Sequence, residues 1–209
     1  MKIKVCGMKH PQNIREVGDL KPDYMGFIFY AKSPRYVPGL PENELPASVL
    51  KTGVFVNESA EKISSLIDEN GLNAIQLHGN ESPEFCQAFY NNVTVFKAFG
   101  VDENFNFDQL NAYAQSVDYF LFDTKTEAHG GSGKTFDWTV LNRYQLSVPF
   151  FLSGGLGLNN LENIKNIKHP AFYGVDLNSR FETEPGMKDI DKLREAFNIL
   201  RANEHEIHS

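Results

Sequence analysis

The stretch "DYFLFD", residues 118–123, decides the fold class of this chain. It is a short, almost wholly apolar run that ends at an aspartate, and a long polar segment follows it. Short runs that are apolar nearly throughout are typical of strands covered on both faces. Seven further runs of this kind follow one another along the chain: "IKVCG" (3–7), "YMGFIFY" (24–30), "TGVFV" (52–56), "NAIQLHG" (73–79), "VTVFKAFG" (93–100), "VPFFLSGG" (148–155) and "FYGVDL" (172–177).

Helical patterns lie between most of these runs. Residues 59–71 give the clearest one, with Ser59 as N-cap candidate and Gly71 as the stop. The segment 33–46 contains too many prolines for a helix. Other helical patterns occur at 11–20, at 82–92, where Ser82 precedes Pro83, at 160–170 and at 189–202.

Eight strands that alternate with helices in about 200 residues predict a parallel α/β fold. We predict a single-domain (β/α)8 barrel over residues 1–202, with a disordered tail at 203–209. The alternative is an open, doubly wound sheet. That fold favours a Gly-x-Gly-x-x-Gly turn after the first strand, and "CGMKHP" (6–11) does not supply it.

The bulk composition excludes several classes of protein. A net charge of −7 argues against a nucleic-acid binder. The two cysteines lack a Cys-x-x-Cys partner, and the histidines show no metal-ligand spacing, so we expect neither a metal site nor a disulfide framework. No signal peptide or membrane-spanning run is present, which predicts a cytoplasmic protein that does not bind membranes.

The stretch "AHGGSGKT" (128–135) resembles the end of a nucleotide-binding P-loop. A P-loop needs a glycine five residues before its Gly-Lys pair, and Ala128 occupies that place. A P-loop also joins a strand directly to a helix, whereas these glycines lie inside a long polar loop. We therefore expect no nucleotide here and interpret the segment as a loop that closes over a substrate.

The strand ends indicate where the chemistry lies, because barrel enzymes build their sites from the carboxyl ends of the strands and the loops that follow. Loops after the seventh and eighth strands often bind phosphate, which points to Gly154, Gly155, Ser179 and Arg180. Cys6 and Asp123 are candidates for an acid–base pair. Either residue alone is commonly structural, but each lies at the first exposed place after its strand.

The chain resembles the phosphoribosylanthranilate isomerases in motifs that run from one end to the other. These motifs are "KVCGM", "GFIFYAKSPRYV", "TGVFVN", "IQLHG", "VFKAF", "LFDTK", "GGSGKTFDW", "FLSGGL", "YGVDLNSRFE" and "PGMKD". The resemblance implies a cofactor-free (β/α)8 barrel of tryptophan biosynthesis. Its reaction is the Amadori rearrangement of N-(5-phosphoribosyl)anthranilate to 1-(2-carboxyphenylamino)-1-deoxyribulose 5-phosphate.

The resemblance also implies roles for individual residues. Cys6 matches the family's general base and Asp123 its general acid, while Arg35 matches an arginine that meets the anthranilate carboxylate. Asp176 lies where it could bind ribose hydroxyls. The chain departs from the family at Arg180, where a glycine is usual, and we expect this arginine to add a contact to the phosphate.

Two alternatives remain open at this point. One is a related sugar-phosphate isomerase of histidine biosynthesis, which would use an aspartate at the first strand end where this chain has Cys6. The other is a non-catalytic barrel that binds a phosphorylated ligand. His78 is interpreted as structural or supporting, Cys86 as core, and Lys97 as a residue that lines the barrel mouth or pairs with a carboxylate.

Overall fold

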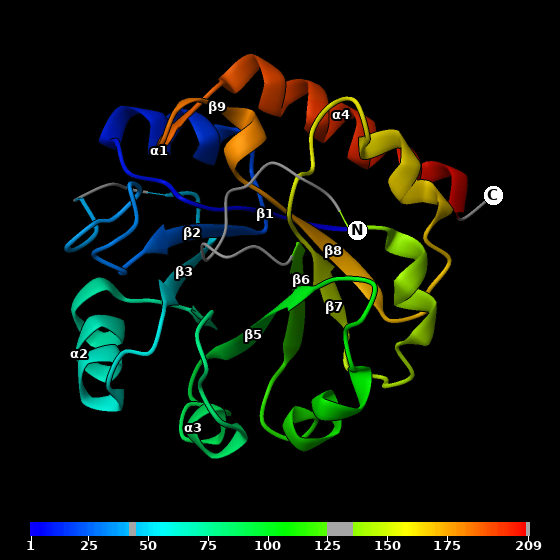
Figure 1. The fold of residues 1–209 in the computed structure, drawn as a ribbon. Helices are drawn as coiled ribbons and strands as arrows, with labels where there is room; N and C mark the ends of the chain where they lie inside the picture. The colour runs from blue at the N-terminus through cyan, green and yellow to red at the C-terminus, as the bar shows by residue number, and fades with distance from the viewer. Residues whose placement is uncertain (42–44, 125–135, 208–209) are drawn as a thin grey trace.

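The computed structural model describes residues 1–41, 45–124 and 136–207 (Figure 1). Eight strands form a closed parallel barrel, and the last strand pairs with the first. This arrangement confirms the predicted (β/α)8 barrel and excludes the open sheet. The strands are β1 (Lys2–Val5), β2 (Tyr24–Ile28), β3 (Leu50–Phe55), β4 (Ala74–Leu77), β5 (Thr94–Val101), β6 (Tyr119–Thr124), β7 (Phe150–Leu152) and β8 (Phe172–Leu177).

The segments between the strands form an outer ring around the barrel (Figure 1). The described part of the chain contains four α-helices and four 3-10 helices, and the last helix of each kind follows the eighth strand. The pattern at 160–170 predicted an ordinary helix, and the structure corrects it to a 3-10 helix. The elements are α1 (Pro11–Asp19), α2 (Ala60–Asn70), α3 (Pro83–Gln87), α4 (Ile190–Ile207), η1 (Phe107–Tyr113), η2 (Trp138–Arg143), η3 (Leu161–Asn166) and η4 (Ser179–Phe181).

The helix ends follow the predicted capping chemistry. The Ser59 side chain accepts a hydrogen bond from the backbone N–H of Lys62, and α2 ends at Gly71 in the left-handed region. Ser82 caps α3 in the same way, with Pro83 at its first position. α4 continues to Ile207 and so includes part of the segment 203–209 for which the sequence predicted disorder.

The sequence patterns did not predict one small element. β9 (Glu182–Glu184) and β10 (Met187–Lys188) form an antiparallel pair between η4 and α4. Gly186 makes the turn with a φ of 92°, a backbone conformation that glycine adopts without strain. The pair lies beside the carboxyl end of the barrel, where two of its side chains reach the cavity region described below.

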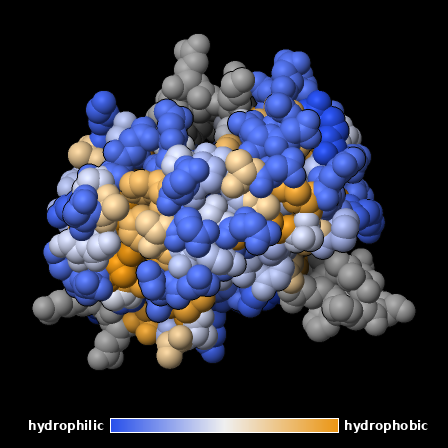
Figure 2. Space-filling model, turned by 90° about the horizontal axis from the view of Figure 1, so that it is seen from below, coloured by the Kyte–Doolittle hydropathy of each residue, from blue (hydrophilic) through white to orange (hydrophobic). Residues whose placement is uncertain are grey.

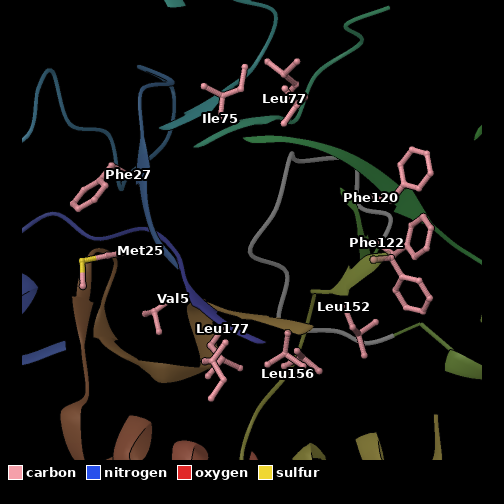
Figure 3. Close-up of a cluster of buried hydrophobic side chains, with 14 of the residues drawn as sticks. Val5, Met25, Phe27, Ile75, Leu77, Phe120, Phe122, Leu152, Leu156 and Leu177 are labelled. Carbon is pink, nitrogen blue, oxygen red and sulfur yellow. The ribbon is translucent and has the colours of Figure 1, made fainter. Parts of the chain in front are cut away.

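The strands divide the core by their alternation of side chains. In β6, Phe120 and Phe122 pack outward against the ring of helices, whereas Leu121 points inside the barrel. Figure 3 shows Phe120 and Phe122 with other side chains of the outward-facing core. The residues that fill the barrel interior near its amino end are Tyr24, Ala74, Phe96, Ala98, Leu121 and Phe151. This apolar plug leaves the carboxyl end for polar groups.

The outer surface mixes polar and apolar residues. Figure 2 shows hydrophilic residues with smaller apolar areas between them on the face that it presents. Tyr173 is the exposed large hydrophobic residue in the described part of the chain, at 37% exposure. None of the described helices combines the length and the apolar character that a membrane span requires.

Candidate active site

A cavity of about 620 Å³ opens at the carboxyl ends of the strands. Its walls come largely from the inward-facing positions at the ends of the strands other than β5 and from the loops that follow them. Seven of the eight residues that the sequence singled out line this cavity: Cys6, Arg35, Asp123, Gly154, Gly155, Asp176 and Ser179. Further lining residues include Ile28, Val54, Val56, Gln76, His78 and Asn178.

Arg180 is the exception among the predicted residues. Its side chain lies over the loop after β7, where a methyl group placed on Gly157 would be 2.9 Å from the Arg180 Cδ. The residue is exposed at the flank of that loop rather than on the cavity wall. The segment 128–135, for which we predicted a closing loop without a nucleotide, lies outside the described residues.

Cys6 follows β1 directly and is almost fully buried. Its backbone N–H donates to the Leu177 carbonyl oxygen at 2.9 Å, which fixes the end of β1 against β8. Gly26 leaves the space that the sulfur occupies, since a methyl group on Gly26 would be 2.7 Å from Sγ. Burial raises the pKa of the Cys6 thiol, and the positive charge of Lys4 opposes this increase.

Asp123 faces the same cavity from β6. The Thr124 backbone N–H donates to its Oδ1 at 2.8 Å. Burial raises the pKa of the Asp123 carboxyl to about 6, and the nearby charge of Asp176 adds to the increase. A carboxylic acid with this pKa keeps a protonated population near neutral pH, which suits a general acid.

His78 lies beside Asp123, with 3.6 Å between its Nε2 and Oδ2 of Asp123. Its Nδ1 is 2.9 Å from the Nε2 of Gln76, a residue of β4. When the Gln76 amide donates to Nδ1, the proton of the neutral imidazole is on Nε2 and faces Asp123. The ring therefore lies between Gln76 and Asp123, and the structural or supporting role of His78 stays a prediction.

A buried ion pair lies under the cavity. The Lys4 Nζ is 2.9 Å from the Asp176 Oδ1, and both side chains are almost inaccessible to solvent. Burial raises the pKa of the Asp176 carboxyl, and the positive charge of Lys4 opposes this increase. The sequence pointed to Asp176 but not to Lys4, although a lysine that interrupts a buried strand at an inward-facing position was a usable signal.

Arg35 is held by the β9–β10 pair. Its Nε and Nη2 donate to the Glu182 carboxylate, at 2.9 and 2.6 Å for the shorter contacts. The Lys188 Nζ donates to the same carboxylate at 2.6 Å and to Asn178 Oδ1 at 2.8 Å. Burial by itself would raise the pKa of Glu182, but Arg35 and Lys188 outweigh it and lower that pKa. Sequence patterns indicated neither Glu182 nor Lys188.

The loop after β7 approaches Asp123 closely. Gly154 has a φ of 82°, and a methyl group there would be 2.4 Å from the Thr124 backbone nitrogen. Asn160 ties the loop together, since its amide donates to the Gly155 carbonyl and its oxygen accepts from the Gly157 N–H. Glycine is thus the residue type that this turn tolerates, and the loop forms one wall of the cavity.

Lys97, which the sequence placed at a strand end, lies away from the cavity wall. Its Nζ is 3.0 Å from the Glu81 Oε2, and both side chains are buried. This contact confirms the interpretation of a lysine paired with a carboxylate. Cys86 is fully buried in the outer core, as predicted. Among the described residues, no group of three or more His, Cys, Asp or Glu side chains could hold a metal ion.

Comparison with known proteins gives a consistent result. The family model described as "N-(5'phosphoribosyl)anthranilate (PRA) isomerase" matches residues 3–199. The N-(5'-phosphoribosyl)anthranilate isomerase of Parabacteroides distasonis is 48% identical over 200 residues, which cover 93% of this chain and 90% of that protein.

Solved structures agree with the sequence relatives. The phosphoribosyl anthranilate isomerase of Thermotoga maritima is 34% identical with a TM-score of 0.81, and the match covers 97% of this chain and 99% of that one. A second isomerase structure, in complex with reduced 1-(o-carboxyphenylamino)-1-deoxyribulose 5-phosphate, is 31% identical with a TM-score of 0.77. That match also covers 97% of this chain and 99% of that one.

Proposed function

The chain belongs to the N-(5'-phosphoribosyl)anthranilate isomerase family, and from this premise we propose that Cys6 and Asp123 catalyse the Amadori rearrangement as general base and general acid. The substrate is N-(5-phosphoribosyl)anthranilate and the product is 1-(2-carboxyphenylamino)-1-deoxyribulose 5-phosphate, an intermediate of tryptophan biosynthesis. The rearrangement moves hydrogen within one molecule, so an acid and a base are sufficient for it.

Asp123 acts first in this proposal. Its carboxyl group protonates the ribose ring oxygen, which opens the ring to a Schiff base. The Cys6 thiolate then removes the proton from ribose C2, and the resulting enolamine tautomerises to the ketose. The observation that most supports this assignment is the raised pKa of Asp123, about 6, in a cavity that Cys6 also lines.

Substrate binding uses the remaining walls of the cavity. Glu182 holds Nε and Nη2 of Arg35, so we assign the anthranilate carboxylate to Nη1 of the same guanidinium. Asp176, on the cavity floor, is assigned to the ribose hydroxyls. The complex of a related isomerase with a reduced carboxyphenylamino-deoxyribulose phosphate supports a ligand of this class.

The phosphate belongs at the loops after β7 and β8 in this proposal. Gly154, Gly155 and Ser179 line the cavity there. Arg180 lies at the flank of the same loop and adds a positive charge next to the phosphate. Its removal in Arg180→Ala should therefore raise KM more than it lowers kcat, and an unchanged KM would contradict its assignment.

The test is an assay that follows the fluorescence of the anthranilate adduct as it is consumed. Cys6→Ser and Asp123→Asn should each lower kcat by at least about a hundredfold, the scale of general acid–base catalysis. Cys86→Ser is the matched control, because Cys86 is buried outside the cavity. Full activity of either site variant would remove the role assigned to that residue, and an inactive wild-type protein would favour a non-catalytic binding barrel. Family membership argues against the histidine-biosynthesis isomerase.

A further inference from the structure

We propose that Lys4 is a positioning residue of this active site, which acts through Cys6 and Asp123 by placing one buried positive charge beneath both. The proposal rests on the proposed function for its link to catalysis. Its first observable, the titration of the Cys6 thiol, does not depend on any substrate. Failure of the proposal can therefore be distinguished from failure of the proposed function.

The strand register puts Lys4 under the site. β1 and β8 pair so that Lys4 lies opposite Asp176, and the Nζ–Oδ1 distance is 2.9 Å. Cys6 is two residues further along β1, so its side chain emerges on the same inner side as Lys4. The positive charge of the Lys4 ammonium acts on the Cys6 thiol and lowers its pKa. One cation thus connects the proposed base with the carboxylate on the cavity floor.

Stability alone is a poor explanation for this lysine. Buried ion pairs are often no more stabilising than apolar side chains of similar volume. Apolar and aromatic residues such as Phe96, Leu121 and Phe151 fill the barrel interior near its amino end, although β3 and β4 also contribute buried polar residues. An apolar residue at position 4 would extend that packing without the desolvation of an ammonium group. The charge of Lys4 is therefore better explained by its effect on Cys6 and Asp123, the two proposed reacting residues.

Charged groups from several elements face the two reacting residues. Around Cys6 these are Lys4 of β1, Asp176 of β8, Lys188 of β10 and Arg35 of the segment between β2 and β3. Burial raises the pKa of the thiol most strongly, and Lys4 is the largest influence that lowers it.

Asp123 is surrounded by Asp176, Lys4, His78 and the Thr124 N–H. Burial raises the pKa of this carboxyl, Asp176 raises it further, and Lys4 opposes both effects. Lys4 is therefore the cation that acts on both reacting groups in the same direction, towards the ionised form. It promotes the thiolate of Cys6 and limits the increase in the pKa of Asp123.

Two single variants should shift the pKa of the Cys6 thiol in opposite directions. Lys4→Met keeps the length of the side chain but removes the charge, so the thiol pKa should rise. Asp176→Asn removes the opposing negative charge, so the thiol pKa should fall. The measurement is the rate of iodoacetamide alkylation of Cys6 against pH, in a Cys86→Ser background. At pH 8 the Lys4→Met protein should react more slowly by about tenfold for each unit of pKa increase.

Lys97→Met is the matched control. Lys97 also forms a buried ion pair, with Glu81, but it lies outside the cavity lining. It should destabilise the protein without moving the alkylation midpoint of Cys6. Equal midpoints in Lys4→Met and its parent would overturn the proposal, as would the same shift in Lys97→Met.

A double variant covers the case in which Lys4→Met does not fold. Lys4→Met with Asp176→Leu replaces the ion pair by apolar side chains and leaves no unpaired buried charge. It should fold, and its alkylation midpoint should lie above that of the parent, because the influence of Lys4 on Cys6 exceeds that of Asp176. A folded double variant with an unshifted midpoint would also overturn the proposal.

The pH dependence of kcat/KM tests whether the pKa of the Cys6 thiol controls turnover. In Lys4→Met, both limbs of the kcat/KM profile should move to higher pH, because the pKa values of Cys6 and Asp123 rise together. A lysine that only supports the fold would lower activity at all pH values without moving either limb. Unmoved limbs in a folded Lys4→Met protein would therefore restrict Lys4 to a structural role and contradict the proposal.

Discussion

At the scale of single residues, Asp123 shows how a group suited to proton transfer destabilises the folded chain. An ordinary aspartate has a pKa of about 3.9 in the unfolded state, whereas burial raises the pKa of Asp123 to about 6. The folded protein thus holds a proton that the unfolded chain releases between these two values. The free energy of unfolding consequently falls as the pH rises from about 4 through 6.

This difference predicts the effect of Asp123→Asn on stability. The amide carries no charge and its oxygen still accepts from the Thr124 N–H, so the variant should be more stable at pH 7.5 by up to about 3 kcal/mol. The gain should disappear near pH 4, where the wild-type carboxyl is protonated in both states. Urea denaturation at the two pH values measures it.

The exposed residue Glu103 provides the control, as Glu103→Gln removes the same charge from the surface. A comparable gain in that variant would show that net charge, rather than burial of Asp123, is responsible. Equal stability of Asp123→Asn and wild type at pH 7.5 would contradict the raised pKa itself.

At the scale of elements, the β9–β10 pair holds an arginine that lines the cavity. Glu182 of β9 accepts from Arg35 through two nitrogens and from Lys188 of β10. Charge-assisted, forked hydrogen bonds of this type hold a guanidinium plane in one orientation. Two short strands outside the barrel therefore determine where Arg35 points.

Glu182→Gln should weaken this hold. Because a charge-assisted hydrogen bond contributes roughly 1.5–3 kcal/mol, we expect KM to rise about tenfold or more. The change in kcat should be smaller, since the proposed acid and base stay in place. Steady-state kinetics measure both constants, with Glu184→Gln as control because Glu184 is exposed on the same strand. An unchanged KM in Glu182→Gln would show that Arg35 needs no such support.

The sequence predicted some of these elements and missed others. The eight strands, the α2 and α3 caps and the strand-end residues that line the cavity followed from apolar runs, capping chemistry and barrel geometry. The β9–β10 pair was missed because strands of two or three residues leave no periodic signal. Lys4 was visible as a lysine in a buried strand, but its pairing with Asp176 depends on the register between β1 and β8, which local sequence does not reveal. The 3-10 form of η3 depends on packing rather than on its apolar spacing.

At the scale of the whole molecule, we expect ligands to stabilise the fold by binding in the cavity and not at the glycine-rich segment 128–135. A reduced carboxyphenylamino-deoxyribulose phosphate at a hundred times its Kd should stabilise the fold by about 2.7 kcal/mol. For a domain of this size that corresponds to a rise in Tm of roughly 5–10 °C.

ATP at millimolar concentration should leave Tm unchanged, because we predict that no nucleotide binds at 128–135. Thermal unfolding with each ligand in turn is the measurement, and inorganic phosphate is the control for binding of the phosphate group alone. A rise in Tm with ATP that matches the rise with the sugar phosphate would restore the nucleotide hypothesis.

The closure of the barrel has a consequence for how the protein is made. The Lys4–Asp176 contact joins residues 172 positions apart in sequence. β1 pairs with β2 on one side, and its pairing on the other side requires β8. A ribosome must therefore release most of the chain before the floor of the cavity can form. Contacts of such long range also slow folding. Nascent chains that stop short of β8 should accumulate no partial isomerase activity, so synthesis yields the working site in a single late step.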